Sequence, residues 1–201
     1  FSMVLLFAAF LALSVSSMMR ETLTYDEPSF YSYGRQILEK RTAIRQEAFH
    51  NSKMPVNALQ ALPQYLCEKW HWNRAIAWAG KVFSYDEYRW WLSRSVTVCF
   101  ALLLLGVVAK WSFDLYGRRG ALLSLMLASS CPTILAHSHY ITTDVPTAAL
   151  MALALYAFWR FCKNPGAGTF LASALLLGVA QLTKYTAALL TLLFAAIGAF
   201  Q

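Results

Sequence analysis

Long apolar segments without a single charge constrain this chain more than any other feature of its sequence. Residues 95–109, 120–136 and 145–159 contain no Asp, Glu, Lys or Arg. A helix of about 17–25 residues crosses the hydrocarbon core of a bilayer, where it must satisfy its own backbone and keep charges out of lipid. Composition agrees, because charged residues make up only 13% of the chain, against about 25% in soluble domains. The sequence therefore predicts an all-α, polytopic transmembrane helical bundle.

Six apolar segments have the composition and approximate length of membrane spans. They lie at about residues 1–18, 95–111, 120–136, 145–161, 168–182 and 185–201, and a long polar loop occupies residues 19–94. The chain begins and stops inside apolar runs, so we interpret residues 1–201 as the N-terminal part of a transmembrane domain. A membrane anchor is favoured over a signal peptide for the first segment.

Basic residues in the short connections predict the orientation of the spans. They gather in two connections, at Lys110, Arg118 and Arg119 and at Arg160 and Lys163. Residues 137–144 contain no Lys or Arg. Because positive charge in short loops marks the cytoplasmic side, parity places residues 19–94, 137–144 and 183–184 together on the opposite side. The net charge of +7 is spread between spans rather than in a dense stripe, which argues against nucleic-acid binding.

Helical periodicity in the long loop indicates two amphipathic helices rather than a linker. Apolar residues recur at three-, four- and seven-residue steps over residues 30–48. A second pattern runs over residues 57–78, where Pro63 is expected to bend the helix. Tryptophans mixed with basic residues are typical of the headgroup level. We therefore expect both helices to lie on the membrane surface.

Asp26 and Glu27 form an adjacent acid pair shortly after the first span. Repulsion between neighbouring carboxylates can raise the pKa of one so that it serves as a base, or both can hold a cation. The alternative is helix capping, because an acid directly before Pro28 is typical of a helix start. Spacing alone favours capping.

The stretch from His137 to Pro146 closes one span and opens the next. Asp144, two residues before Pro146, has the pattern of a helix N-cap. His137 and His139 are candidates for titration near neutral pH or for metal binding. Two histidines two residues apart do not share a helix face, so a divalent metal is only a weak alternative.

Two cations stand where positive charge is unexpected. Lys184 interrupts an apolar stretch, and a lysine at a span centre costs about 2.5–3.5 kcal/mol on insertion scales, so we expect the chain to turn there. Arg94 opens the second span on the outer side, against the positive-inside bias, which indicates a local anionic partner. Interfacial anchoring explains either residue as well as binding of an anionic phosphate does.

Together, these acids and cations suit transfer from a phosphate-linked donor. A carboxylate can deprotonate an acceptor hydroxyl while cations stabilise the departing phosphate. A transporter is one alternative, although it would favour ionisable groups at mid-span and inverted repeats. A non-catalytic membrane scaffold, in which the acids only cap helices, is the other.

The order of the motifs resembles the polyprenyl-phosphate-sugar transferases of the GT-C superfamily. The most similar group is glycosyltransferase family 39, the protein O-mannosyltransferases and aminoarabinose transferases. The resemblance covers nearly the whole chain and rests on these stretches in order: one span, Asp26-Glu27, Met54-Pro55-Val56-Asn57-Ala58-Leu59 through Ala61-Leu62-Pro63, Arg94, Ala136-His137-Ser138 through Thr142-Thr143-Asp144, and Gly178 through Leu182-Thr183-Lys184-Tyr185.

The resemblance implies a multi-pass enzyme of the bacterial inner membrane that acts on the extracytoplasmic face. Such enzymes move a sugar from a polyprenyl-phosphate donor to a lipid, glycan or protein acceptor and usually invert the anomeric centre. Asp26 resembles the catalytic carboxylate, with Glu27 beside it, and the predicted substrate-binding residues are Arg94, Asp144, Lys184 and His139. Lys184 resembles the lysine that contacts the lipid phosphate. Family members carry further spans and often a soluble C-terminal domain, so activity of these 201 residues alone is not predicted.

Overall fold

The computed structural model describes residues 2–39, 54–70 and 85–199. These residues form the helices α1 (Ser2–Arg20), α2 (Glu27–Leu38), α4 (Met54–Lys69), α6 (Tyr85–Ser129), α7 (Pro132–His137), α8 (Asp144–Lys163), α9 (Ala167–Gln181) and α10 (Leu189–Ala199), with the short 3-10 helix η2 (Tyr185–Ala188) before α10. No strand occurs among them. The predicted all-α class is confirmed for this part of the chain.

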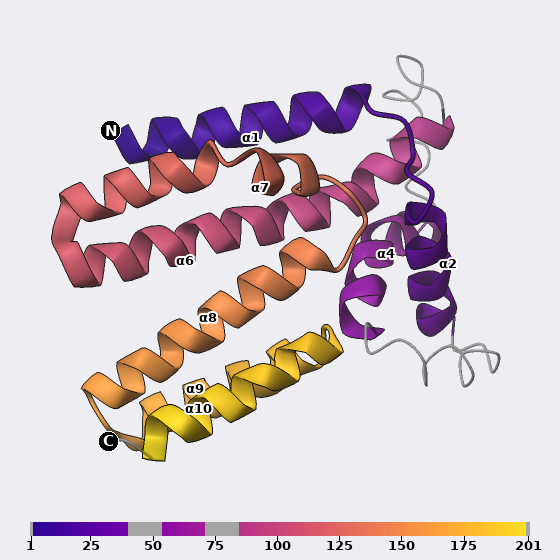
Figure 1. Ribbon diagram of the computed structural model, residues 1–201. Helices are drawn as coiled ribbons and strands as arrows, with labels where there is room; N and C mark the ends of the chain where they lie inside the picture. Colours follow the sequence, from indigo (N-terminus) through magenta and orange to yellow (C-terminus); the bar gives the residue numbers. More distant parts are fainter. Residues whose placement is uncertain (1, 40–53, 71–84, 200–201) are drawn as a thin grey trace.

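The helices α1, α6, α8, α9 and α10 run side by side as a bundle, and α2 and α4 gather beyond one end of it (Figure 1). Three stretches are long and apolar enough to cross a membrane: α1, residues 90–129 of α6, and α8. The apolar helices α9 and η2–α10 are shorter. The chain is therefore a membrane protein, and all six predicted segments fall largely within helices.

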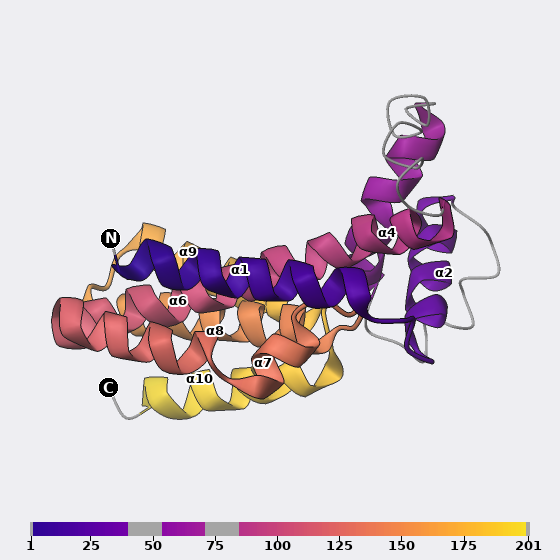
Figure 2. The same ribbon diagram turned by 90° about the horizontal axis from the view of Figure 1, so that it is seen from above.

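The long helix α6 contains a sharp reversal at Gly117. This residue has φ +68° and ψ −163°, a conformation that favours glycine because it has no Cβ. The two limbs run antiparallel (Figure 2), and the Ser124 hydroxyl donates across them to Ser112 Oγ at 2.7 Å. The returning limb stops at Ser129, and α7 begins at Pro132, so residues 120–136 do not form one continuous helix. Proline suits the first turn of a helix but not its interior.

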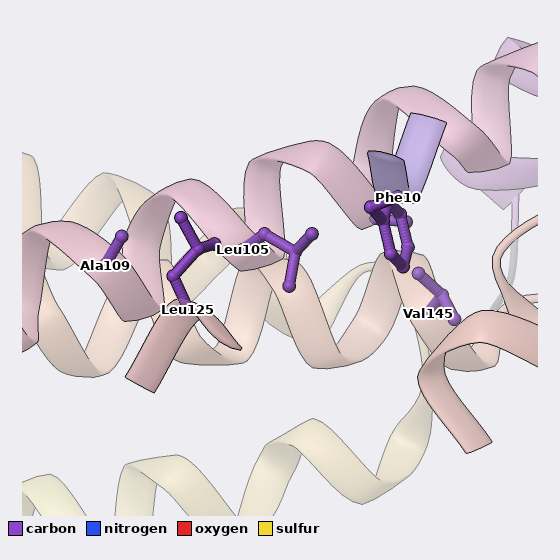
Figure 3. Close-up of a cluster of buried hydrophobic side chains, with 6 residues drawn as sticks. Phe10, Leu105, Ala109, Leu125 and Val145 are labelled. Carbon is purple, nitrogen blue, oxygen red and sulfur yellow. The ribbon is translucent and has the colours of Figure 1, made fainter. Parts of the chain in front are cut away.

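Aliphatic and aromatic side chains from several helices form the interior of the bundle. Phe10 of α1, Leu105 and Leu125 of the two α6 limbs, and Val145 of α8 are all buried in one cluster (Figure 3). A second cluster joins α8, α9 and α10, where the rings of Phe158 and Phe194 stack with centroids 4.0 Å apart. Buried alanines in both clusters let helices approach closely, as is common between membrane helices.

The helices α2 and α4 pack against each other, as expected for the amphipathic helices of the long loop. Both helices begin three residues before the predicted position, and residues 40–48 and 71–78 of the predicted helices lie outside the described part of the chain. Arg35 of α2 forms an ion pair with Glu68 of α4 at 2.8 Å. Gly34 is buried against the backbone of Asn57, which allows the two helix axes to come close.

We expect Gly34→Ala to destabilise the α2–α4 pair. A Cβ at this position would lie 2.0 Å from the backbone oxygen of Asn57, so one helix must move, and overpacking of this kind costs about 1–3 kcal/mol. Gly106→Ala in α6 is the matched control, because its Cβ would meet nothing within 4 Å. Thermal unfolding in detergent should show a lower melting temperature for Gly34→Ala only. Equal melting temperatures for the two variants would contradict this packing.

Candidate functional site

The predicted site residues all lie at one end of the bundle, which we call the site end. It comprises the end of α1, the start of α2, the first described turns of α6, the connection from α7 to α8, and the turn between α9 and η2. The basic residues of the short connections lie at the opposite end, near the reversal of α6 and the end of α8 (Figure 1). We call this the basic end. Residues far apart in sequence therefore share one end, as parity predicted.

A buried ion pair between Glu27 and Arg94 holds the site end together. The two residues are 0% and 1% exposed, respectively. Arg94 Nε donates to Glu27 Oε1 at 2.8 Å, and a terminal nitrogen of Arg94 donates to Glu27 Oε2 at 2.6 Å. This is the bidentate geometry in which a guanidinium binds a carboxylate most strongly. The anionic partner expected for Arg94 is thus Glu27.

Every N–H group of the Arg94 guanidinium has a partner within the protein. Besides the two bonds to Glu27, three N–H groups donate to the backbone oxygens of Met18, Glu21 and Thr22, each at 3.1 Å. These carbonyls follow one another where α1 ends, so Arg94 fixes the path of the chain from α1 towards α2. In this arrangement Arg94 has no N–H group left for a substrate phosphate.

The Glu27 carboxylate also binds two backbone N–H groups. Thr24 donates to Oε2 at 2.9 Å, and Ile141 donates to Oε1 at 3.0 Å. Burial alone would raise the pKa of Glu27, but the hydrogen bonds from Arg94, Thr24 and Ile141 outweigh it and hold that pKa below its ordinary value. Glu27 therefore stays ionised and connects α2, α6 and the connection before α8.

Asp26 differs from Glu27 in its exposure and in its lack of a described partner. It occupies the N-cap position of α2, yet its side chain makes no capping hydrogen bond and is exposed. Its carboxylate has no partner among the described residues, whereas Glu27 points inward to Arg94. The two acids do not converge on one cation, and no group of three or more His, Cys, Asp or Glu in the described ranges is arranged to hold a metal.

Asp144 and Lys184 form an ion pair between two connections of the site end. Lys184 Nζ lies 2.8 Å from Asp144 Oδ1, and the side chains are 28% and 55% exposed, respectively. The chain turns at residues 182–184, as predicted from the charge of Lys184. The N-cap of α8 is Thr143 and not Asp144, which is the first helical residue and uses its carboxylate for Lys184. The capping interpretation of Asp144 was therefore wrong.

His139 belongs to a cluster with Glu21 and Tyr140 that sequence reasoning did not identify. His139 is 1% exposed, and its Nε2 lies 2.7 Å from Glu21 Oε2, which also accepts a hydrogen bond from the Tyr140 hydroxyl. The bond to Glu21 raises the pKa of Tyr140 to about 12. A hollow of about 260 Å³ opens beside the cluster and is lined by Glu21 and Trp90, among others. Glu21 and His139 are 118 residues apart, and no spacing rule connects them.

Gln60 attaches α4 to the site end and was likewise missed. Its side-chain amide donates to Thr97 Oγ1 of α6 and to the backbone oxygen of Thr142, both at 2.9 Å. Gln60 is fully buried. A buried glutamine in an amphipathic pattern offers a weak signal, because polar residues on such helices usually face water.

We expect Glu27→Ala and Arg94→Ala each to lower stability strongly, because either leaves an unpaired buried charge at a cost of about 3–5 kcal/mol. The double variant should lose less than the sum of the two single losses, since it leaves no unpaired charge. Melting temperatures of the three variants in detergent measure this coupling. Arg118→Ala, an exposed arginine at the basic end, is the control and should have little effect. Additive losses would show that the pair is not coupled.

Comparison with known families places this site in context. A family model described as dolichyl-phosphate-mannose-protein mannosyltransferase (PMT_2) matches residues 76–200, more than half of the chain. The match includes Arg94, His139, Asp144 and Lys184 and begins after Asp26 and Glu27. No curated protein and no solved structure matches the chain. The chain therefore belongs to the dolichyl-phosphate-mannose-protein mannosyltransferase family, one of the glycosyltransferase families of the GT-C superfamily.

Proposed function

We propose that the protein transfers a sugar from a polyprenyl-phosphate donor to a hydroxyl of a lipid, glycan or protein, with Asp26 as the base. The observation that carries this proposal is the contrast between the two adjacent acids. Glu27 is buried and saturated with hydrogen bonds, whereas Asp26 is exposed and has no partner among the described residues. A general base needs a carboxylate that an acceptor can reach.

A chain of contacts connects Asp26 with the half-buried cation of Lys184. Glu27, next to Asp26, accepts a hydrogen bond from the backbone of Ile141, three residues before Asp144. Asp144 in turn holds Lys184. In the proposed reaction Lys184 exchanges Asp144 for the donor phosphate, and Asp144 remains beside it. Glu27 and Arg94 act as positioning residues in this scheme, because neither has a free donor or acceptor site.

The bond changes of the proposed transfer are simple. Asp26 accepts the proton of the acceptor hydroxyl as that oxygen attacks the anomeric carbon of the sugar. The bond from this carbon to the phosphate oxygen breaks, and the phosphate gains one negative charge that Lys184 stabilises. Attack opposite the leaving phosphate inverts the anomeric centre. The hollow beside Glu21 supplies space for a polar part of a substrate at the same end.

The charge distribution supports a site that faces away from the cytoplasm. The basic end carries Lys110, Arg118, Arg119, Arg160 and Lys163, and short basic loops remain cytoplasmic. The site end then opens on the extracytoplasmic face, which in a bacterial inner membrane is the periplasmic one. Transport is less well supported, because three predicted spans contain no Asp, Glu, Lys or Arg at mid-span, where carriers commonly place ionisable groups.

Asp26→Asn should reduce the turnover rate by about 10²–10⁴-fold, the contribution typical of a general base. The assay uses the full-length protein in membrane vesicles with a polyprenyl-phosphate-linked sugar and measures transfer at saturating donor. Glu39→Gln is the matched control, since it also removes a carboxylate from the region of α2 but lies at the opposite end of that helix, where it pairs with Arg35. Membrane levels of both variants should equal that of the wild type. Full activity of Asp26→Asn would remove Asp26 from this role.

Lys184→Gln should raise the KM for the polyprenyl-phosphate donor more than it lowers kcat. Removing the cation weakens phosphate binding, while the base and the rest of the site end remain in place. Asp144→Asn should have the opposite effect on donor binding, because it frees Lys184 from the competing carboxylate. Initial rates over a range of donor concentrations separate the two parameters. An unchanged KM in both variants would contradict contact between Lys184 and the phosphate.

A further inference from the structure

A second cavity lies between α8 and α9 near the basic end, remote from the candidate site. Its volume is about 350 Å³, and side chains of both helices line it. Arg160 and Tyr156 contribute from α8, and Thr169 contributes from the first turn of α9. The sugar-transfer scheme uses none of these residues.

The lining of the cavity changes from polar to apolar with depth. Since α8 runs towards the basic end and α9 runs away from it, Arg160, Gly168 and Thr169 are the lining residues nearest that end. Leu153 lies seven residues before Arg160 in α8, and Leu176 lies seven residues after Thr169 in α9. Both line the cavity about 10 Å further from the basic end. The cavity is therefore cationic and hydroxylated at its mouth and apolar below.

Aromatic residues place the mouth at the headgroup level of the membrane. The rings of Trp111, Tyr156 and Trp159 lie together, with centroids 6.0 to 6.1 Å apart. Tryptophan and tyrosine concentrate where the hydrocarbon core meets the headgroups. Polar groups at the mouth would then meet headgroups, and the apolar lining would meet acyl chains.

Arg160 is the cation in this cavity that has no partner. Its guanidinium is exposed and makes no hydrogen bond or ion pair with any described residue. Asp114 lies within electrostatic range, but its carboxylate is bound by Lys110 and the Tyr156 hydroxyl. Thr169 donates its hydroxyl proton to the backbone oxygens of Asn164 and Gly166, each at 3.0 Å, which leaves lone pairs on its oxygen. The mouth therefore offers a free positive charge.

We propose that this cavity binds an anionic phospholipid of the leaflet at the basic end. The phosphate lies on the Arg160 guanidinium, whose planar fork matches phosphate oxygens. One acyl chain follows the apolar lining between α8 and α9. The further cations of the basic end that lie outside α8, Lys110, Arg118 and Arg119, favour an anionic headgroup over a zwitterionic one. A free phosphate would leave the apolar lining unused.

Native mass spectrometry of the full-length protein, titrated with phosphatidylglycerol, tests the phosphate contact. Arg160→Gln should weaken phosphatidylglycerol binding about tenfold to a hundredfold, as expected for loss of a charge-assisted hydrogen bond. Lys163→Gln is the matched control, because it removes one charge from the same helix end but its ammonium lies over the Trp159 ring, 5.6 Å from the centroid. The control should change affinity less than twofold. Equal losses in the two variants would indicate general surface attraction and overturn the proposal.

Ala172→Phe tests the acyl-chain contact without a change of charge. Ala172 is exposed and lines the cavity, so a phenyl ring there fills the lipid path without disturbing the core. This variant should also weaken phosphatidylglycerol binding, and its melting temperature should stay near that of the wild type. Inorganic phosphate at high excess should not displace the lipid. Unchanged binding by Ala172→Phe, equal binding of phosphatidylcholine, or displacement by phosphate would each overturn the proposal.

Discussion

Burying the carboxylate of Glu27 beside the guanidinium of Arg94 is costly unless every charge and N–H group finds a partner, and this requirement determines the geometry of the site end. The pair meets it with backbone groups from three separate stretches, at the end of α1, before α2 and before α8. Those stretches carry or adjoin Asp26, Glu21, His139 and Asp144. The buried pair of Glu27 and Arg94, with all of its hydrogen bonds made, thus fixes the positions of the residues around it.

Much of the fold follows from the sequence because the bilayer restricts the alternatives. The charge-free segments at residues 95–109 and 145–159 predicted helices that are long enough to span a membrane, and the distribution of Lys and Arg predicted which connections share an end. The charge of Lys184 predicted the turn before η2, where the chain does reverse. The break at Pro132 was not predicted, because the prediction of this span relied on the absence of charge, and the absence of charge does not register a change of helix direction.

The roles of individual residues in the site were harder to predict, because these roles depend on contacts between residues that are distant in sequence. Adjacent acids such as Asp26 and Glu27 look alike in sequence, and contacts of Glu27 with distant residues, Arg94 above all, distinguish them. Local pattern gave Asp144 a capping role, but an ion pair with a lysine 40 residues later prevailed. Glu21 and Gln60 looked like ordinary surface polar residues. Their roles required partners more than 30 residues away in each case.

The partners of Glu27 lie far from it along the sequence, and this separation affects the order in which the protein can assemble during synthesis. The N-terminal part of a chain emerges first from the ribosome, so Glu27 reaches the membrane long before Arg94, and Ile141 arrives later still. Until then the Glu27 carboxylate has neither its counter-ion nor its last hydrogen bond, and water must solvate it. The start of α2 can therefore lock into place only after the hairpin of α6 has been inserted. Assembly of the connection between α1 and α2 therefore depends on segments that are synthesised much later.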